Sequence, residues 1–268
     1  KDAQYCALDI ADTSAVKAAL RGIPEIIDLA YGTAPKTSFD DPILDVQVNL
    51  PPSISLMTAV SELEPRAFIL VSSGGTVYGD PDTLPIAESH QLRPLSPYGI
   101  TKYAVERYGA LFHRSKGLPV IIARPSNAYG EAQDASQGQG FIGAAVRKYL
   151  SGQRIPIFGF PGTIRDYIYV SDVAKALIAI LEKGRIGEAY NIGSGQGRNN
   201  AEIVEQLAAL AAVRGMPEPE IELLSGRFFD VKTSVLDINK LQSLTGWKPE
   251  IRLDEGMERV LDFFLRKQ

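Results

Sequence analysis

The sequence predicts an α/β protein built on a doubly wound parallel sheet. Short apolar runs typical of buried strands alternate with longer segments of helical periodicity, and small hydroxyl residues directly follow the strand run that ends at Val71. At 268 residues, 45% hydrophobic and 22% charged, the chain can bury the core of one or two domains. Ligands bind open parallel sheets at the carboxyl ends of the strands, so we expect the site there.

The first half of the chain alternates strands with helices. Asp12 or Thr13 can cap the first helix, which runs through Leu20, and Ser96 followed by Pro97 marks a later helix start. The predicted strands lie at 5–8, 25–30, 68–71 and 120–123, and the other helices at about 42–61 and 98–116.

The second half is less regular. Helices are predicted at about 141–150, 172–182 and 199–213, with a strand near 190–192. The chain therefore leaves the first unit after Ala123, returns, and leaves again. We therefore predict two interleaved domains. The first comprises residues 1–123 and about 164–193 and binds a dinucleotide. The second is a smaller α/β unit that comprises about 124–163 and 194–268 and binds the substrate.

Composition narrows the function classes. The net charge of −4 gives no indication of a nucleic-acid or membrane partner, so an anionic ligand must be held by local arginines. Cys6, the single cysteine, excludes an internal disulfide; we expect a buried, inert thiol and a cytoplasmic protein. The two histidines, His90 and His113, form no His/Cys cluster with the spacing of metal ligands, so we predict that the protein binds no metal.

Tyr98 and Lys102 lie four residues apart on the helix that begins at Pro97, so they share one face. A free tyrosine titrates near pH ~10, and making it a base near neutrality means stabilising its anion by about 4 kcal/mol. A lysine one turn away supplies part of that stabilisation.

Two motifs carry a family resemblance. Residues 71–79 read V-S-S-G-G-T-V-Y-G, and residues 97–102 read P-Y-G-I-T-K. They resemble the S-S-x-x-V-Y-G strand end and the P-Y-G-x-S/T-K helix of the extended short-chain dehydrogenase/reductases, specifically the NAD-dependent nucleotide-sugar epimerases and dehydratases, similar to UDP-glucose 4-epimerase. Further matches, such as R-D-Y-I-Y-V-S-D-V-A at 165–174, extend along the chain.

The resemblance implies a Rossmann-like fold, NAD as cofactor and a catalytic pair of Tyr98 and Lys102. Many members have the catalytic Ser or Thr where this chain has Gly74, so the hydroxyl that contacts the sugar 4-oxygen must come from Thr76 or Ser73, with Thr76 preferred.

Cofactor and substrate residues follow from the same motifs. Asn127, Arg165 and Arg227 would bind the sugar nucleotide, the arginines being suited to bidentate contact with a diphosphate. Asp28 stands where the family usually has histidine. The residues expected to bind the cofactor, besides the catalytic pair, are Asp9, Ile10, Leu29, Ala30, Tyr31 and Asn49.

The family would open with a strand, a G-x-x-G-x-x-G loop and a helix, and nothing before Asp9 contains them. We therefore expect the first βαβ unit to be absent from this sequence, and a chain that starts at Lys1 to bind NAD poorly and have little activity, because that loop holds the pyrophosphate.

The favoured function is epimerisation of a nucleoside-diphosphate hexose at C4. A 4,6-dehydratase needs an acid and a base where this chain has Gly75 and Thr76; a 4-reductase and a non-catalytic sensor remain alternatives. The family also implies a homodimer through the helices at 42–61 and 98–116. Their apolar residues could cover more than one face: Leu50, Ile54, Met57, Val60, Val105, Leu111 and Phe112.

Overall fold

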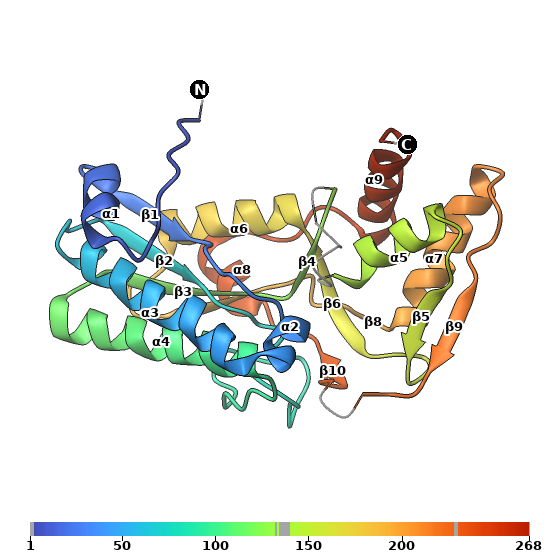
Figure 1. Cartoon of the computed structure of the whole chain (residues 1–268), viewed down its shortest axis with the longest axis horizontal. Coiled ribbons are helices and arrows are strands. Elements are labelled where there is room, and N and C mark those ends of the chain that lie inside the picture. The colour runs from blue at the N-terminus through green and yellow to red at the C-terminus, as the bar shows by residue number, and fades with distance from the viewer. Residues whose placement is uncertain (1–2, 132, 134–139, 228–229, 268) are drawn as a thin grey trace.

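The protein is described by a computed structural model that covers residues 3–131, 133, 140–227 and 230–267. Its main sheet has four strands in the order β1-β2-β3-β7, and every neighbouring pair is parallel. The carboxyl ends of these strands therefore meet at one edge, as the sequence predicts (Figure 1). The strands span Glu25–Asp28 (β1), Ala67–Val71 (β2), Val120–Pro125 (β3) and Ala189–Ile192 (β7).

Helices cover both faces of this sheet, which makes it doubly wound (Figure 1). Phe68 and Leu70 pack into a core under α1, α3 and α4, whereas Ile69 between them packs into a second core under α6. This alternation follows from the period of two in a strand. The helices are α1 (Thr13–Leu20), α3 (Pro42–Ser61), α4 (Pro97–Lys116) and α6 (Val170–Lys183).

The starts of α3 and α4 agree with the sequence signals. Asp41 caps α3 by accepting from the Leu44 amide at 2.9 Å, and Ser96 caps α4 by accepting from the Gly99 amide at 3.1 Å. A proline follows each cap, where its missing N–H is not needed. Gly117 ends α4 in the left-handed conformation, with φ +71°.

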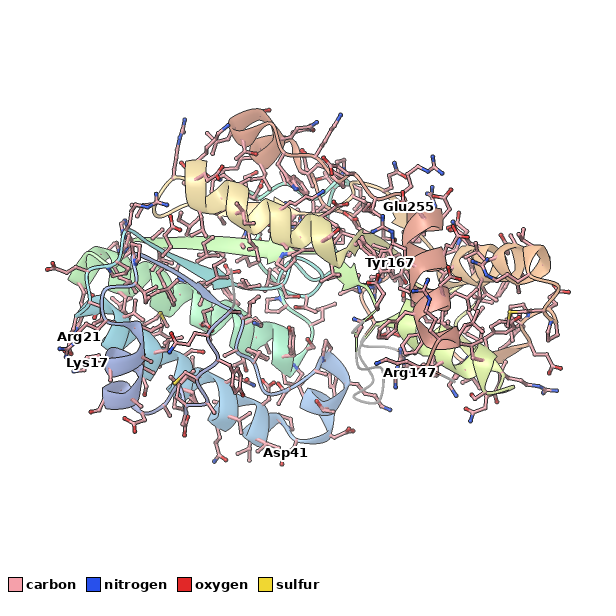
Figure 2. All side chains as sticks on the ribbon, turned by 90° about the horizontal axis from the view of Figure 1, so that it is seen from above. Lys17, Arg21, Asp41, Arg147, Tyr167 and Glu255 are labelled. Carbon is pink, nitrogen blue, oxygen red and sulfur yellow. The ribbon has the colours of Figure 1, made fainter. Side chains whose placement is uncertain are left out.

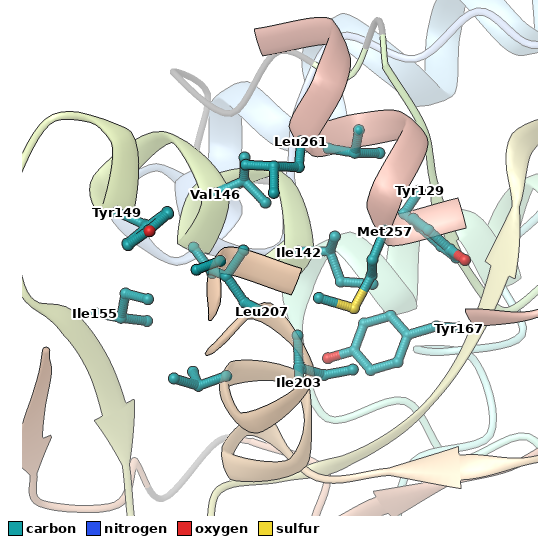
Figure 3. Packing of buried hydrophobic residues seen from close by; sticks show 14 of the residues in the cluster. Tyr129, Ile142, Val146, Tyr149, Ile155, Tyr167, Ile203, Leu207, Met257 and Leu261 are labelled. Atoms are coloured by element: carbon teal, nitrogen blue, oxygen red, sulfur yellow. The ribbon is translucent and has the colours of Figure 1, made fainter. Parts of the chain in front are cut away.

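The rest of the described chain forms smaller sheets and a separate core, at the opposite end of the molecule from α1 (Figures 1 and 2). β6 (Ile164–Tyr169) lies between β4 (Asn127–Tyr129) and β10 (Thr233–Ser234), and also pairs with β8 (Gly197–Arg198). β5 (Ile155–Phe158) pairs with β9 (Ile221–Leu224). Apolar side chains such as Ile142, Leu207 and Met257 fill this core (Figure 3). Its helices are α5 (Phe141–Leu150), α7 (Asn200–Val213) and α9 (Leu253–Leu265).

The chain crosses between these two parts more than once. Leu241 in α8 (Asn239–Thr245) and the following Trp247 pack into the core under α6, although they fall in the second predicted segment. The Trp247 indole donates to the Asp172 carbonyl at 3.2 Å and is 8% exposed, so it is a packing anchor. The division into the two interleaved domains named above stays a prediction.

Two predictions near the start of the chain are wrong. Residues 5–8 form no strand, and Cys6 is exposed rather than buried. An apolar run becomes a strand only where a neighbour accepts its hydrogen bonds, and β1 pairs with β2 alone. Since the segment stays outside the sheet, the thiol is left exposed. The sequence analysis also did not identify α2 (Pro35–Asp40), α8 and α9.

Candidate active site

The segment after β2 turns sharply at the edge of the sheet. The Ser72 amide donates to the Ala123 carbonyl at 2.8 Å, which extends the β2–β3 pairing by one residue. At Gly74 an added Cβ would lie 2.5 Å from Leu236 Cδ1 and 2.8 Å from the Arg124 carbonyl oxygen. Glycine is therefore required for packing at this position, and a serine or threonine would not fit without a shift of the backbone.

The start of α4 is pressed against the same turn. The Tyr98 amide donates to Ser38 Oγ of α2 at 3.1 Å, which fixes the first turn of the helix. A Cβ at Gly99 would come within 2.9 Å of the Thr76 carbonyl oxygen, so the glycine allows the helix to approach. Tyr98, Ser73 and Thr76 thereby line one cavity.

The two candidate hydroxyls, those of Ser73 and Thr76, differ in their hydrogen bonding. A hydrogen bond joins Ser73 to the Tyr98 side chain. Thr76 Oγ1, in contrast, is buried and has no hydrogen-bond partner among the described residues. Since buried hydroxyls are nearly always paired, Thr76 Oγ1 has the property expected of a group that binds a ligand.

The pKa of Tyr98 is raised above that of a free tyrosine. Burial is the main cause, the charge of Asp45 adds to it, and the Ser73 hydrogen bond partly offsets it. The prediction that Lys102 depresses this pKa is not met in the protein alone. Lys102 Nζ lies 6.0 Å from the centre of the Tyr98 ring, and desolvation dominates.

Lys102 is 7% exposed, and its ammonium donates to the Val71 carbonyl at 2.9 Å. Burial lowers its pKa to about 8, although nearby Asp28, Glu106 and Asp45 favour the charged form. Lys102 is therefore still mostly protonated at pH 7.

The cavity has a volume of about 420 Å³, within the range of small-molecule sites. The three residues predicted to bind substrate, Asn127, Arg165 and Arg227, line the same cavity. Burial lowers the pKa of Arg165, and Arg227 donates to Asp230 at 2.9 Å and stacks on Phe158 with 4.1 Å from its guanidinium carbon to the ring centre. One wall thus carries two guanidinium groups.

The predicted cofactor residues other than Tyr98 lie outside this cavity. Asp9 and Leu29 are exposed near the end of β1, and Asn49 is buried in α3. Asn49 accepts from the Gly32 amide at 2.7 Å and donates to the Asp45 carbonyl at 2.7 Å, so its contacts hold the loop after β1. Ile10, Ala30 and Tyr31 lie in the same segments as these residues.

Part of the cavity wall was not predicted from the sequence. Lys36 and Phe39 of α2 line it, as does Ser126, whose buried Oγ has no partner among the residues that the structure describes. Pro35 before Lys36 was the available signal, because proline is favoured at the first turn of a helix.

Within the described ranges, no group of three or more His, Cys, Asp or Glu side chains could hold a metal ion. In the same ranges, no helix combines the length and apolar character needed to cross a membrane.

Fold and site together define an α/β enzyme with a ligand cavity at the carboxyl edge of a parallel sheet. A family model described as "NAD dependent epimerase/dehydratase family" matches residues 1–193. The chain therefore belongs to this family of extended short-chain dehydrogenase/reductases, and NAD is the family's cofactor.

Individual proteins agree with this assignment. A putative UDP-glucose 4-epimerase of Methanocaldococcus jannaschii is 36% identical over 263 residues, 97% of this chain and 84% of that protein. A dTDP-glucose 4,6-dehydratase of Xanthomonas campestris pv. campestris is 29% identical over 259 residues, 91% of this chain and 73% of its own. The crystal structure of a Thermotoga maritima UDP-glucose 4-epimerase with UDP-glucose has a TM-score of 0.91 at 30% identity, covering 99% and 85% of the two chains.

The residues at the sheet edge suit NAD. Asp9 presents an exposed carboxylate whose Oδ1 accepts the Ala11 amide at 2.9 Å, and Leu29 is 66% exposed in the turn after β1. At the other end, Lys102 and Tyr98 place an ammonium and a phenol beside the cavity. A carboxylate can accept from the adenine amine, an apolar side chain can pack on the adenine ring, and an ammonium with a phenol can bond the hydroxyls of the nicotinamide ribose.

Proposed function

We propose that the protein epimerises a nucleoside-diphosphate hexose at C4 through a 4-keto intermediate, with NAD as cofactor. The observation that carries this proposal is the set of residues that line one cavity: the phenol residue Tyr98, the hydroxyl residues Ser73 and Thr76, and Asn127 with two arginines. A hexose linked to a diphosphate presents a reacting hydroxyl and a negative charge, and these two kinds of residue suit them.

In this proposal Tyr98 takes the proton of the 4-hydroxyl, and Thr76 Oγ1 hydrogen-bonds the 4-oxygen. When bound, NAD would supply the hydride chemistry at C4. The base is the Tyr98 phenolate, which takes the proton of the 4-hydroxyl as the ketone forms and gives it back to the 4-oxygen afterwards, so atoms and charge balance over the cycle. Because burial raises the pKa of Tyr98, its ionisation depends on positive charge nearby, which Lys102 and the oxidised cofactor would supply.

Arg165 and Arg227 would hold the diphosphate, each through charge-assisted hydrogen bonds. Because the diphosphate is bound tightly at these arginines, the keto sugar can rotate and present its other face without leaving the site. Lys102 would hold the nicotinamide ribose, Leu29, Ala30 and Tyr31 would lie along the cofactor, and Asp9 with Ile10 would meet the adenine.

A 4,6-dehydratase is less well supported, although such an enzyme is among the relatives. It needs an acid and a base before V-Y-G, where Gly75 has no side chain and Thr76 is a hydroxyl. Among the described residues that line the cavity, Asp230 is the one carboxylate, and Arg227 already binds it. A 4-reductase uses the same residues and is the second candidate.

The test is incubation of the full-length protein and NAD with UDP- and dTDP-hexoses, with products resolved by NMR. The proposal expects a C4 epimer and its loss in Tyr98→Phe. A 4-keto-6-deoxy product would establish a dehydratase, and a product formed only with NADH or NADPH a reductase. NAD binding with no turnover of any sugar would favour the sensor.

We also propose a homodimer through α3 and α4, in the cytoplasm. Most residues first expected at that interface are instead in the core: Met57, Val60, Val105 and Phe112 are 8% exposed or less. Leu111, also first expected there, is 46% exposed, and other apolar residues of the two helices are 39–69% exposed, namely Ile43, Leu44, Val46, Val48 and Ile100. A monomeric mass by light scattering at micromolar concentration would refute the dimer.

A reducing compartment suits the exposed thiol of Cys6.

A further inference from the structure

Tyr31 packs against both residues of the catalytic pair. Lys102 Nζ lies 3.9 Å from the centre of the Tyr31 ring, and the Tyr31 and Tyr98 rings meet edge to face with their centres 4.9 Å apart. The Tyr31 hydroxyl also donates to the Tyr98 carbonyl at 3.4 Å.

The loop that carries Tyr31 is held by buried groups of α3. Asn49 accepts from the Gly32 amide at 2.7 Å and donates to Thr33 Oγ1 at 2.9 Å, and Thr33 in turn donates to Asp45. Asp45 is fully buried, and it also accepts from Thr101 Oγ1 at 2.6 Å, one residue before Lys102. The loop and α4 are therefore fixed to the same carboxylate.

We propose that Tyr31 is a positioning residue for the reaction: the face of its ring holds the Lys102 ammonium, and the ring packs edge to face against Tyr98. This inference rests on the proposed roles of Tyr98 and Lys102. An ammonium over an aromatic face is attracted by the ring quadrupole, most strongly where water is excluded.

The donors of Lys102 support this role. An ammonium has three N–H groups. The Val71 carbonyl takes one and the Tyr31 ring faces another, which leaves one for the nicotinamide ribose. Two fixed contacts determine where the third donor points, so the ring limits the rotation of the ammonium.

Several ionisable groups act on Lys102 besides the ring. Asp28, Glu106 and Asp45 favour its charged form, whereas burial disfavours it. Glu106 is itself bound by Arg124 at 2.7 Å. Substitutions at Tyr31 leave these three carboxylates in place, so a change in the titration of Lys102 reports on the ring and on the water that its removal admits.

The test compares three variants of the full-length protein. Tyr31→Phe keeps the ring, Tyr31→Leu fills the space without an aromatic face, and Tyr31→Ala opens it. The first readout is the Lys102 pKa by NMR of the lysine side chains without cofactor, with the signal assigned by Lys102→Gln. We expect Lys102 to titrate as in the wild type in Tyr31→Phe. Its pKa should be lower in Tyr31→Leu, because the attraction to the ring is lost, and higher in Tyr31→Ala, because water enters the space.

The second readout is kinetic. We expect kcat within about twofold of wild type in Tyr31→Phe and about tenfold lower in Tyr31→Leu. KM should be unchanged, because the diphosphate is bound elsewhere. Equal Tm values of Tyr31→Phe and Tyr31→Leu would show that both variants are equally well folded. Wild-type titration and kcat in Tyr31→Leu would overturn the proposal. If the wild type epimerises no sugar, the proposed function fails, and the titration still decides whether the ring holds Lys102.

Discussion

Thr76→Val separates the contribution of Thr76 to stability from its contribution to catalysis. Valine has nearly the shape of threonine and lacks the hydroxyl, and Thr76 Oγ1 is buried without a partner in the described part of the chain. A buried unpaired polar group costs about 1–3 kcal/mol, so its removal should leave the free energy of unfolding unchanged or raise it by up to about 1 kcal/mol. For a chain of this size that is a rise in Tm of about 2–4 °C.

Catalysis should change in the opposite direction. If Thr76 Oγ1 bonds the reacting 4-oxygen, its loss removes about 1.5–3 kcal/mol of transition-state stabilisation, which lowers kcat by about 10- to 100-fold. The assays are thermal unfolding by circular dichroism and epimer formation by NMR at saturating substrate.

Thr101→Val is the matched control. Thr101 Oγ1 is also buried, but it donates to Asp45 Oδ2 at 2.6 Å, so its removal leaves a buried carboxylate short of a donor. This variant should lose about 1–3 kcal/mol of stability. A Thr76→Val protein that is destabilised like Thr101→Val, or that keeps full kcat, would refute the reasoning.

Three further predictions concern the cavity and the residues beside it. Arg165→Gln and Arg227→Gln should each weaken UDP binding by about 10- to 100-fold in calorimetry, with less effect on kcat; unchanged affinity would remove that arginine from the diphosphate site. Gly74→Ser should destabilise by about 1–3 kcal/mol without raising kcat, because its Cβ meets Leu236 and a fixed carbonyl, and a wild-type Tm would contradict this. Burial lowers the pKa of Lys102 to about 8, so below pH 8 the folded state bears the cost of a buried charge, and above it that cost is relieved. Lys102→Met should therefore be inactive, more stable than wild type at pH 7, and lose this advantage between pH 8 and 10 in thermal melts.

Local signals were sufficient to predict the main sheet and its long helices. A proline after a capping residue sets the start of α3 and of α4, and a glycine with positive φ sets the end of α4. Apolar runs such as residues 67–71 form strands because helices cover both faces of the sheet.

Features that depend on distant partners could not be predicted in this way. Residues 5–8 have a strand-like pattern but no neighbouring strand, and α2 has six residues, too few for a periodic pattern. In the site, the motifs identified which side chains meet in the cavity, but the Tyr98 pKa depends on burial, and Gly74 on its contact with Leu236 from far along the chain.

The buried carboxylate of Asp166, next to Arg165 in the sequence, joins three segments of the chain. Asp166 Oδ1 accepts from the Ser194 amide at 2.7 Å and from its hydroxyl at 2.6 Å, and Oδ2 accepts from the amides of Gly195 and Leu236 at 3.2 Å. Hybrids made by exchanging segments between relatives must therefore keep these residues from one parent. A crossover between 167 and 193, or between 196 and 235, would place Asp166 and its donors in backbones that did not evolve together and would displace the neighbouring Arg165.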